Sequence, residues 1–144
     1  MEGLVVKLVE SEDERRAAYA VRVRVFVHEQ GVPYEEELDE EDETATHAIA
    51  ILDGKGVGTG RLVRDGVREA RIGRMAVDME WCGRGVGGRI LDVLEEAARA
   101  LGMAEAVLHA QTYVQGFYAS HGYAEEGNVF LEVGIEHVRM RKRL

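Results

Sequence analysis

The stretch IGRMAVDMEWCGRGVGGRILDVLEEAARALG, residues 72–102, decides the fold of this 144-residue chain. It predicts a strand that ends near residue 77, then a glycine-rich loop, then a long helix that buries one apolar stripe. Gly102 follows this helix and marks its end. The stripe repeats at helical spacing and consists of Val86, Ile90, Val93, Leu94, Ala97, Ala98 and Leu101.

The glycine cluster at residues 83–88 points to an anion-binding loop. The first N–H groups of a helix have no partner inside it and carry partial positive charge. Glycine also lets a phosphate approach the backbone closely, and Arg84 adds a fixed cation. The alternative interpretation is a tight turn that only allows the strand and the helix to pack.

The spacing Gly83-x-Gly85-x-x-Gly88 also matches a dinucleotide-binding pattern, with Glu105 about 20 residues further on. That pattern belongs after the first parallel strand of a doubly wound unit. Here the preceding segments predict an antiparallel meander instead. A dinucleotide-binding protein is therefore the less favoured interpretation.

The regions on either side of the loop predict a mixed sheet with helices on it. Before the loop, strands are expected at residues 4–9, 46–52, 56–63 and 67–77. The pairs Asp53-Gly54 and Asp65-Gly66 are typical of hairpin turns and join the last three of these strands into the meander. After the long helix, the sequence predicts a strand at 104–110, a short helix at 111–121 and one or two strands within 129–143.

Residues 11–30 predict a further helix, which begins at a capping box formed by Ser11 and Glu14. The alternation of Val and Arg inside it is typical of a strand, but the Gly and Pro that follow form a helix stop. The next segment, 34–43, contains eight acidic residues and is expected to be an exposed loop, with a short helical turn as an option. Its charge either attracts a cationic substrate or only keeps that face solvated.

Composition and charge fit one domain that spans residues 1–144. The net charge of −9 arises within residues 10–43, which contain 13 acids and 4 bases. Nucleic-acid partners are not expected, because the only basic cluster is a short one at the C-terminal end. A membrane partner is not expected either, since the uncharged stretch 106–124 carries many polar side chains.

Cys82 is the only cysteine, which excludes an internal disulfide and a zinc site built from several cysteines. A single thiol suits a reducing compartment, and the N-terminus lacks the basic segment of a signal peptide. We therefore expect a cytoplasmic protein that uses no metal.

These motifs resemble those of the GNAT superfamily of acetyl-CoA-dependent N-acetyltransferases. In the family pattern Val-x-x-x-x-[Gln/Arg]-x-x-Gly-x-[Gly/Ala], the matching residues are Val77, Gly85 and Gly87, with Cys82 at the position of the usual Gln or Arg. The stretch QTYVQGFYASHGY at 111–123 is similar to a second family motif, with Gln111 in place of Asn. Further likeness at 25–47 and 132–140 is to small acyltransferases of the ElaA type.

The resemblance implies an α/β fold of the GNAT acyl-CoA N-acyltransferase type, with a central mixed, mostly antiparallel sheet flanked by helices. It implies transfer of an acetyl group from acetyl-CoA to a primary amine by direct attack in a ternary complex. The amine is a small molecule or a peptide, and a homodimer is one option for assembly. The residues implied in binding the CoA group are Met75, Ala76, Val77, Cys82, Gly83, Arg84, Gly85, Val86, Gly87, Gly88 and Gln111.

Tyr118, in the second motif, is the first candidate for the chemistry. A phenol is neutral at pH 7, so it can donate a proton or a hydrogen bond to the leaving sulfur. The alternative is a core aromatic residue. The backbone N–H of Met75 is a candidate for polarising the thioester oxygen.

The proton acceptor is less well defined, because Arg71 occupies the position where some family members carry a Glu. Carboxylates and neutral histidines can both take this proton. The resemblance to the ElaA type implies Glu29 and Glu132 ahead of the histidines at 47, 109 and 137. Arg74, His47 and His109 are expected at the acceptor site, although an ion pair for Arg74 and structural roles for the histidines are the alternatives. A non-catalytic CoA-binding sensor also remains open.

Overall fold

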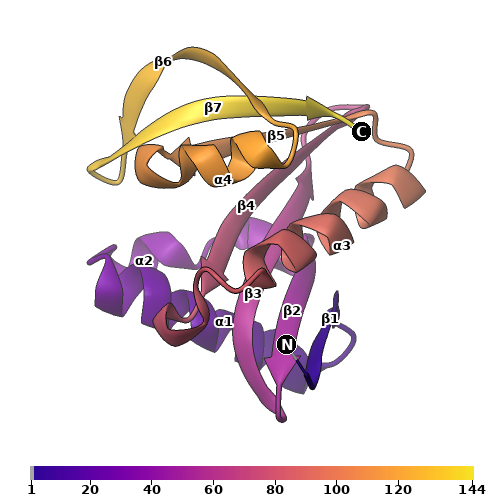
Figure 1. Ribbon diagram of the computed structural model, residues 1–144, viewed down its shortest axis with the longest axis vertical. Helices are drawn as coiled ribbons and strands as arrows, with labels where there is room; N and C mark the ends of the chain where they lie inside the picture. The colour runs from indigo at the N-terminus through magenta and orange to yellow at the C-terminus, as the bar shows by residue number, and fades with distance from the viewer. Residues whose placement is uncertain (1) are drawn as a thin grey trace.

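The computed structural model describes residues 2–144, which form a seven-stranded mixed sheet with helices on both faces (Figure 1). The strand order is β1-β2-β3-β4-β5-β7-β6. The strands are β1 (Leu4–Leu8), β2 (Thr46–Leu52), β3 (Lys55–Arg64), β4 (Glu69–Val77), β5 (Glu105–Gln111), β6 (Ala124–Glu132) and β7 (Ile135–Arg143). The helices are α1 (Glu12–Arg22), η1 (Val23–Glu29), α2 (Tyr34–Glu37), η2 (Glu40–Glu43), η3 (Met79–Trp81), α3 (Val86–Ala100), η4 (Thr112–Val114) and α4 (Gln115–Ser120).

The pairing of the strands confirms the predicted mixed, mostly antiparallel sheet. Strands β2, β3 and β4 form the expected antiparallel meander. Asp53 and Gly54 turn the first hairpin with φ values of 51° and 79°, the left-handed conformations that tight hairpin turns require. The β4–β5 pair is parallel, and α3 makes the crossover between these two strands. Along residues 2–144, no helix is long and apolar enough to cross a membrane.

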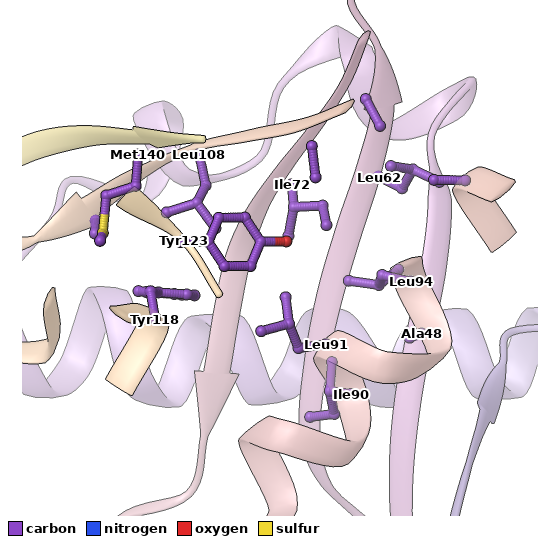
Figure 2. Close-up of a cluster of buried hydrophobic side chains, with 14 of the residues drawn as sticks. Ala48, Leu62, Ile72, Ile90, Leu91, Leu94, Leu108, Tyr118, Tyr123 and Met140 are labelled. Atoms are coloured by element: carbon purple, nitrogen blue, oxygen red, sulfur yellow. The ribbon is translucent and has the colours of Figure 1, made fainter. Parts of the chain in front are cut away.

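Helix α3 packs its predicted stripe against one face of the sheet. In Figure 2, Leu91 and Leu94 of α3 lie in one cluster with Leu62 of β3 and Ile72 of β4. Ile90 packs against Gly58 and Gly60 of β3. The stripe differs from the prediction at its end, because Leu101 is about half exposed. In Figure 1, α3 lies in front of the sheet while α1 and α2 lie behind it.

The predicted helix at 11–30 is present, but its second half is a π-helix, η1. Val21 and Val25 are buried together against Ala76 of β4. Arg22 and Arg24 extend instead to carboxylates on neighbouring elements.

The acidic segment 34–43 contains the short helical turn that was one option, and its exposed positions agree with the prediction, but two of its acids correct the expectation of an exposed loop. It forms α2 and η2, and both Glu37 and Asp42 are buried. Arg22 of α1 donates to Glu37 at 2.8 Å and to Asp42 at 2.7 Å, and Arg61 of β3 donates to Asp42 at 2.9 Å. The acids fold inward because these two arginines, themselves buried, need charged partners.

A β-bulge in β4 separates this strand from β5. Arg61 of β3 lies opposite Gly73, whereas Thr59 lies opposite Ala76, so β4 contains one extra residue at Arg74, whose φ is 52°. Pairing with β5 stops at Ile72 opposite Leu108. Beyond that pair, residues 73–77 of β4 and 109–111 of β5 diverge and do not pair with each other. We call these two diverging segments the β4/β5 fork.

Gly60 of β3 permits the close packing behind the bulge. A Cβ at this position would lie 2.6 Å from Met75 Sδ and 2.8 Å from Leu94 Cδ1. Gly60→Ala is therefore expected to lower the free energy of unfolding by about 1–3 kcal/mol through overpacking. Denaturant unfolding measures this loss. The control is Gly116→Ala in α4, where a Cβ would meet nothing within 4 Å. An equal response of both variants would contradict this account.

Candidate active site

The loop before α3 presents unpartnered backbone N–H groups. Gly85 is the N-cap of α3 and provides no capping side chain, and the first bond within the helix joins Arg89 N–H to Gly85 O at 3.2 Å. Within the described residues, the N–H groups of residues 86–88 therefore have no hydrogen-bond acceptor. Gly83 and Gly85 have positive φ values, and an added Cβ at either would meet nothing within 4 Å. These properties leave room for an approaching phosphate. An added Cβ at Gly87 or Gly88 would instead meet Phe117 at 3.3 Å or His121 at 2.9 Å, so these two glycines also serve packing.

Cys82 and Arg84 flank this loop with different properties. The guanidinium of Arg84 lies over the Trp81 ring, 5.3 Å from its centroid. The Sγ of Cys82 lies 3.5 Å from the Val77 carbonyl oxygen. Burial, followed by the nearby carboxylates of Glu29 and Asp78, raises the pKa of the Cys82 thiol. The thiol therefore stays protonated at neutral pH, which does not favour a nucleophilic role.

The β4/β5 fork lies beside this loop in the chain. Ala76 and Val77 of β4 pair with β3 on one side, and residues 75–77 have no β5 partner on the other. Their free strand edge can hydrogen-bond an extended ligand that carries amide groups, as one strand pairs with another. An added Cβ at Gly73, where the fork begins, would meet nothing within 4 Å.

Tyr118 lies in the core beneath the fork, next to Tyr123 and Leu108 (Figure 2). Its side chain is largely buried, yet its hydroxyl has no hydrogen-bond partner among the described residues. Of residues 2–144, only His47 has a side-chain polar atom that is both enclosed and unpartnered, so the Tyr118 hydroxyl keeps some accessible surface. Burial, together with the neighbouring Tyr113, raises the pKa of Tyr118. The phenol is thus a neutral hydrogen-bond donor.

Gln30, which the sequence analysis did not single out, bridges the N-terminal helices to the far side of the fork. The Gln111 side-chain amide donates to Gln30 Oε1 at 2.9 Å, and Gln30 Nε2 donates to the Tyr113 hydroxyl at 3.3 Å. Gln111 thus lies on the η1 side of the sheet. The signal in the sequence that could have pointed to Gln30 is its place in the ElaA-like stretch that begins at residue 25.

Three further candidates from the sequence lie together on the last strands. His109 Nδ1 is 3.0 Å from Glu132 Oε1, and His137 Nε2 is 3.6 Å from Glu132 Oε2. The Phe130 ring meets the His109 ring edge-on at 5.1 Å and stacks on the His137 ring at 6.0 Å. The structure therefore joins one predicted catalytic carboxylate to a predicted substrate-binding histidine.

Three other candidates lie apart from this group. His47 is 3% exposed and its Nε2 lies 2.9 Å from the Asp42 carbonyl oxygen, which corrects the expected substrate contact because a buried ring offers no substrate surface. Burial also lowers the pKa of His47. Arg74 is held by Asp39 at 3.1 Å and by Glu37 at 3.5 Å, the ion-pair alternative. Glu29 is exposed at the end of η1, near Cys82.

Comparison with known proteins identifies the family to which this chain belongs. The sequence model of one protein family, the acetyltransferase (GNAT) domain, matches residues 10–144. The chain is 40% identical to an uncharacterized N-acetyltransferase of Bacillus subtilis, YjcF, over 94% of this chain and 96% of that protein.

Solved structures agree with this match. An acyl-CoA N-acyltransferase from Pseudomonas aeruginosa superimposes with a TM-score of 0.86 at 28% identity, covering 96% of this chain and 99% of that one. Escherichia coli ElaA does so with a TM-score of 0.84 at 24% identity, again over 96% and 99% of the two chains, which confirms the expected likeness at the level of the fold. The chain belongs to the GNAT family of acetyltransferases.

Proposed function

We propose that this acetyltransferase moves an acetyl group from acetyl-CoA to a primary amine, which attacks directly while both substrates are bound. The observation that carries the proposal is the set of unpartnered N–H groups at residues 86–88, placed beside the β4/β5 fork. The first can hold a diphosphate, and the second offers a strand edge to the amide-bearing arm that joins a diphosphate to a thioester. When bound, acetyl-CoA supplies the activated acyl group.

The chain's own residues then bind and orient the acyl donor. The loop at 83–88 contributes backbone donors and the Arg84 cation, while Cys82 provides no long side chain at the family's Gln or Arg position. Met75, Ala76 and Val77 contribute the free edge of β4. The Met75 N–H follows the bulge at Arg74 and is the proposed donor to the thioester oxygen.

Tyr118 donates a hydrogen bond to the departing sulfur in this proposal. Its raised pKa keeps the phenol protonated and makes complete proton transfer to a thiolate more difficult. Tyr118 therefore acts chiefly through its hydrogen bond. Glu132 and Glu29 are the carboxylates proposed to assist proton removal from the amine, and Glu132 is favoured because it contacts His109, through which it can act.

The proposal is tested by incubating the purified protein with acetyl-CoA and a panel of small amines and N-terminal peptides. Release of free CoA thiol that depends on the amine supports it. Calorimetric titrations with CoA and with NADPH give the second readout. Tight CoA binding without thiol release with any amine would support the non-catalytic sensor, and NADPH binding in place of CoA binding would overturn the family function.

Tyr118→Phe removes only the hydroxyl and keeps the packed ring. We expect kcat to fall at least about 10-fold, because the leaving sulfur loses its hydrogen-bond donor, while the affinity for CoA changes little. Steady-state kinetics and CoA titration separate the two quantities. Tyr123→Phe is the matched control, since its hydroxyl donates to Glu95 at 2.8 Å inside the core. Wild-type turnover in Tyr118→Phe would remove the proposed role.

A further inference from the structure

His109, Glu132 and His137 lie together on the last three strands, and Glu132 is hydrogen-bonded to His109. The proposed function does not yet say which of these side chains takes the proton from the amine. We propose that His109 Nε2 is the proton acceptor for the amine, and that Glu132 is a positioning residue which sets the tautomer of His109. This inference rests on the proposed acetyl transfer, because it assigns the proton acceptor at that same site.

The location of His109 supports this role. Ile72 and Leu108 are the last pair between β4 and β5, so Gly73 and His109 are the first residues of the diverging segments. Side chains alternate along a strand, and Leu108 faces the core with α3. His109 therefore faces the other side of the sheet, together with Gln111, whose amide reaches Gln30. Its neighbour across the fork is Gly73, where a side chain would meet open space.

The hydrogen bond to Glu132 determines which ring nitrogen of His109 can accept a proton. A carboxylate only accepts hydrogen bonds, so the 3.0 Å contact requires a proton on His109 Nδ1. In the neutral ring, Nε2 then carries the free lone pair. Among the described residues, His109 Nε2 has no hydrogen-bond partner, and the side chain is one-third exposed.

His137 lies on the other side of Glu132 and is too buried to meet a substrate. Its side chain is 6% exposed, and its Nδ1 donates to the Ile135 carbonyl oxygen at 2.7 Å. Its Nε2 lies 3.6 Å from the second oxygen of Glu132, beyond hydrogen-bond distance. The hydrogen bond of Glu132 within this group is therefore the one to His109.

The proton balance is as follows. His109 Nε2 takes one proton from the acceptor ammonium and later releases it to solvent. The freed nitrogen lone pair forms a bond to the acetyl carbon, and the C–S bond breaks with its electron pair leaving on sulfur. The amide nitrogen loses its second proton, and the sulfur gains one, so the products are the acetylated amine, CoA thiol and one proton.

Histidine ¹⁵N chemical shifts in the free protein test the tautomer without any substrate. We expect His109 to carry its proton on Nδ1 in the wild type and in Glu132→Gln, whose amide oxygen still accepts. In Glu132→Ala the proton should move to Nε2, the nitrogen that carries it in free histidine. A proton on Nε2 in the wild type would overturn the assignment of Glu132 whether or not acetyl transfer is observed.

Kinetics test the proton acceptor. His109→Ala should lower kcat about 100-fold with nearly unchanged CoA affinity, and added imidazole should restore at least a tenth of the lost rate. Glu132→Ala should lower kcat at least about 10-fold, whereas Glu136→Gln on the same hairpin should not. Wild-type turnover in His109→Ala, or a loss that imidazole does not relieve, overturns the proposal. Failure of wild-type thiol release with every amine instead overturns the proposed function.

Discussion

Arg22→Ala is expected to lower the free energy of unfolding by about 3–5 kcal/mol, as removal of one partner from a buried ion pair does. Arg22 is 1% exposed, and besides Glu37 and Asp42 it donates to the Glu37 carbonyl oxygen at 2.7 Å. Alanine would leave two buried carboxylates without their main cation. Denaturant unfolding at neutral pH measures the loss.

Because Asp42 must be ionised to pair with Arg22, the stability lost in Arg22→Ala should depend on pH. Burial alone would raise its pKa, but the hydrogen bonds from Arg22, the Asp39 N–H and Arg61 hold the pKa at about 2, below its ordinary value of 3.8. A lowered folded pKa contributes stability that is present above the unfolded pKa and is lost as the pH falls toward 2. The cost of Arg22→Ala should therefore shrink in acid.

Arg16→Ala provides the matched control for this prediction. Arg16 pairs with Asp13 on the exposed side of the same helix, with side chains 68% and 90% exposed. Such surface pairs contribute little to stability, so this variant should unfold almost as the wild type does. If both arginine variants lose the same small amount, the buried network is not what holds α1, α2 and η2 on the sheet.

Local patterns in the sequence were enough to predict the elements around the glycine loop. Three such features depend only on residues that are close together in the sequence: the stripe of α3, the Asp53-Gly54 turn and the capping box at Ser11. Physical preferences of this kind act before any tertiary contact forms. The order of these elements along the chain was then sufficient to predict a mixed sheet.

The fate of the acidic segment could not be predicted in the same way. Arg22 finds Glu37 15 residues away and Asp42 20 residues away, and Arg61 reaches Asp42 from another strand. A run of acids is usually solvated, and nothing within the run shows which two will be buried. The bulge at Arg74 could not be predicted from the sequence either. Residues other than glycine rarely adopt positive φ, and Arg74 does so with a φ of 52°.

The candidate site was predictable in part for the same reason. The glycine loop is a local motif, so its residues were found together. The contact between His109 and Glu132 joins residues 23 apart, and it needed the register of β5, β6 and β7. Glu29 at the end of η1 and His47 in β2 lie on other elements and do not join the group. The types of residue were therefore visible in the sequence, but their grouping was a property of the sheet.

Gly85→Asp is expected to weaken CoA binding about 1000-fold. Gly85 caps α3 with a φ of 84° and leaves the first N–H groups of the helix free. A carboxylate at an N-cap accepts from the N–H of the second or third helical residue, here Gly87 or Gly88. Two charge-assisted hydrogen bonds to the diphosphate, at about 2 kcal/mol each, would be lost, which corresponds to about three factors of ten in affinity.

Gly85→Asn separates the effect of charge from that of shape. Asparagine also caps helices and, like aspartate, tolerates positive φ, but it brings no negative charge near the diphosphate. Calorimetric titration with CoA should show a clearly smaller loss for Asn than for Asp, while thermal unfolding of both variants stays close to that of the wild type, because a capped helix is not weakened. CoA binding by Gly85→Asp within about 10-fold of the wild-type affinity would mean that the diphosphate lies elsewhere, and the function drawn from this loop would fall with it.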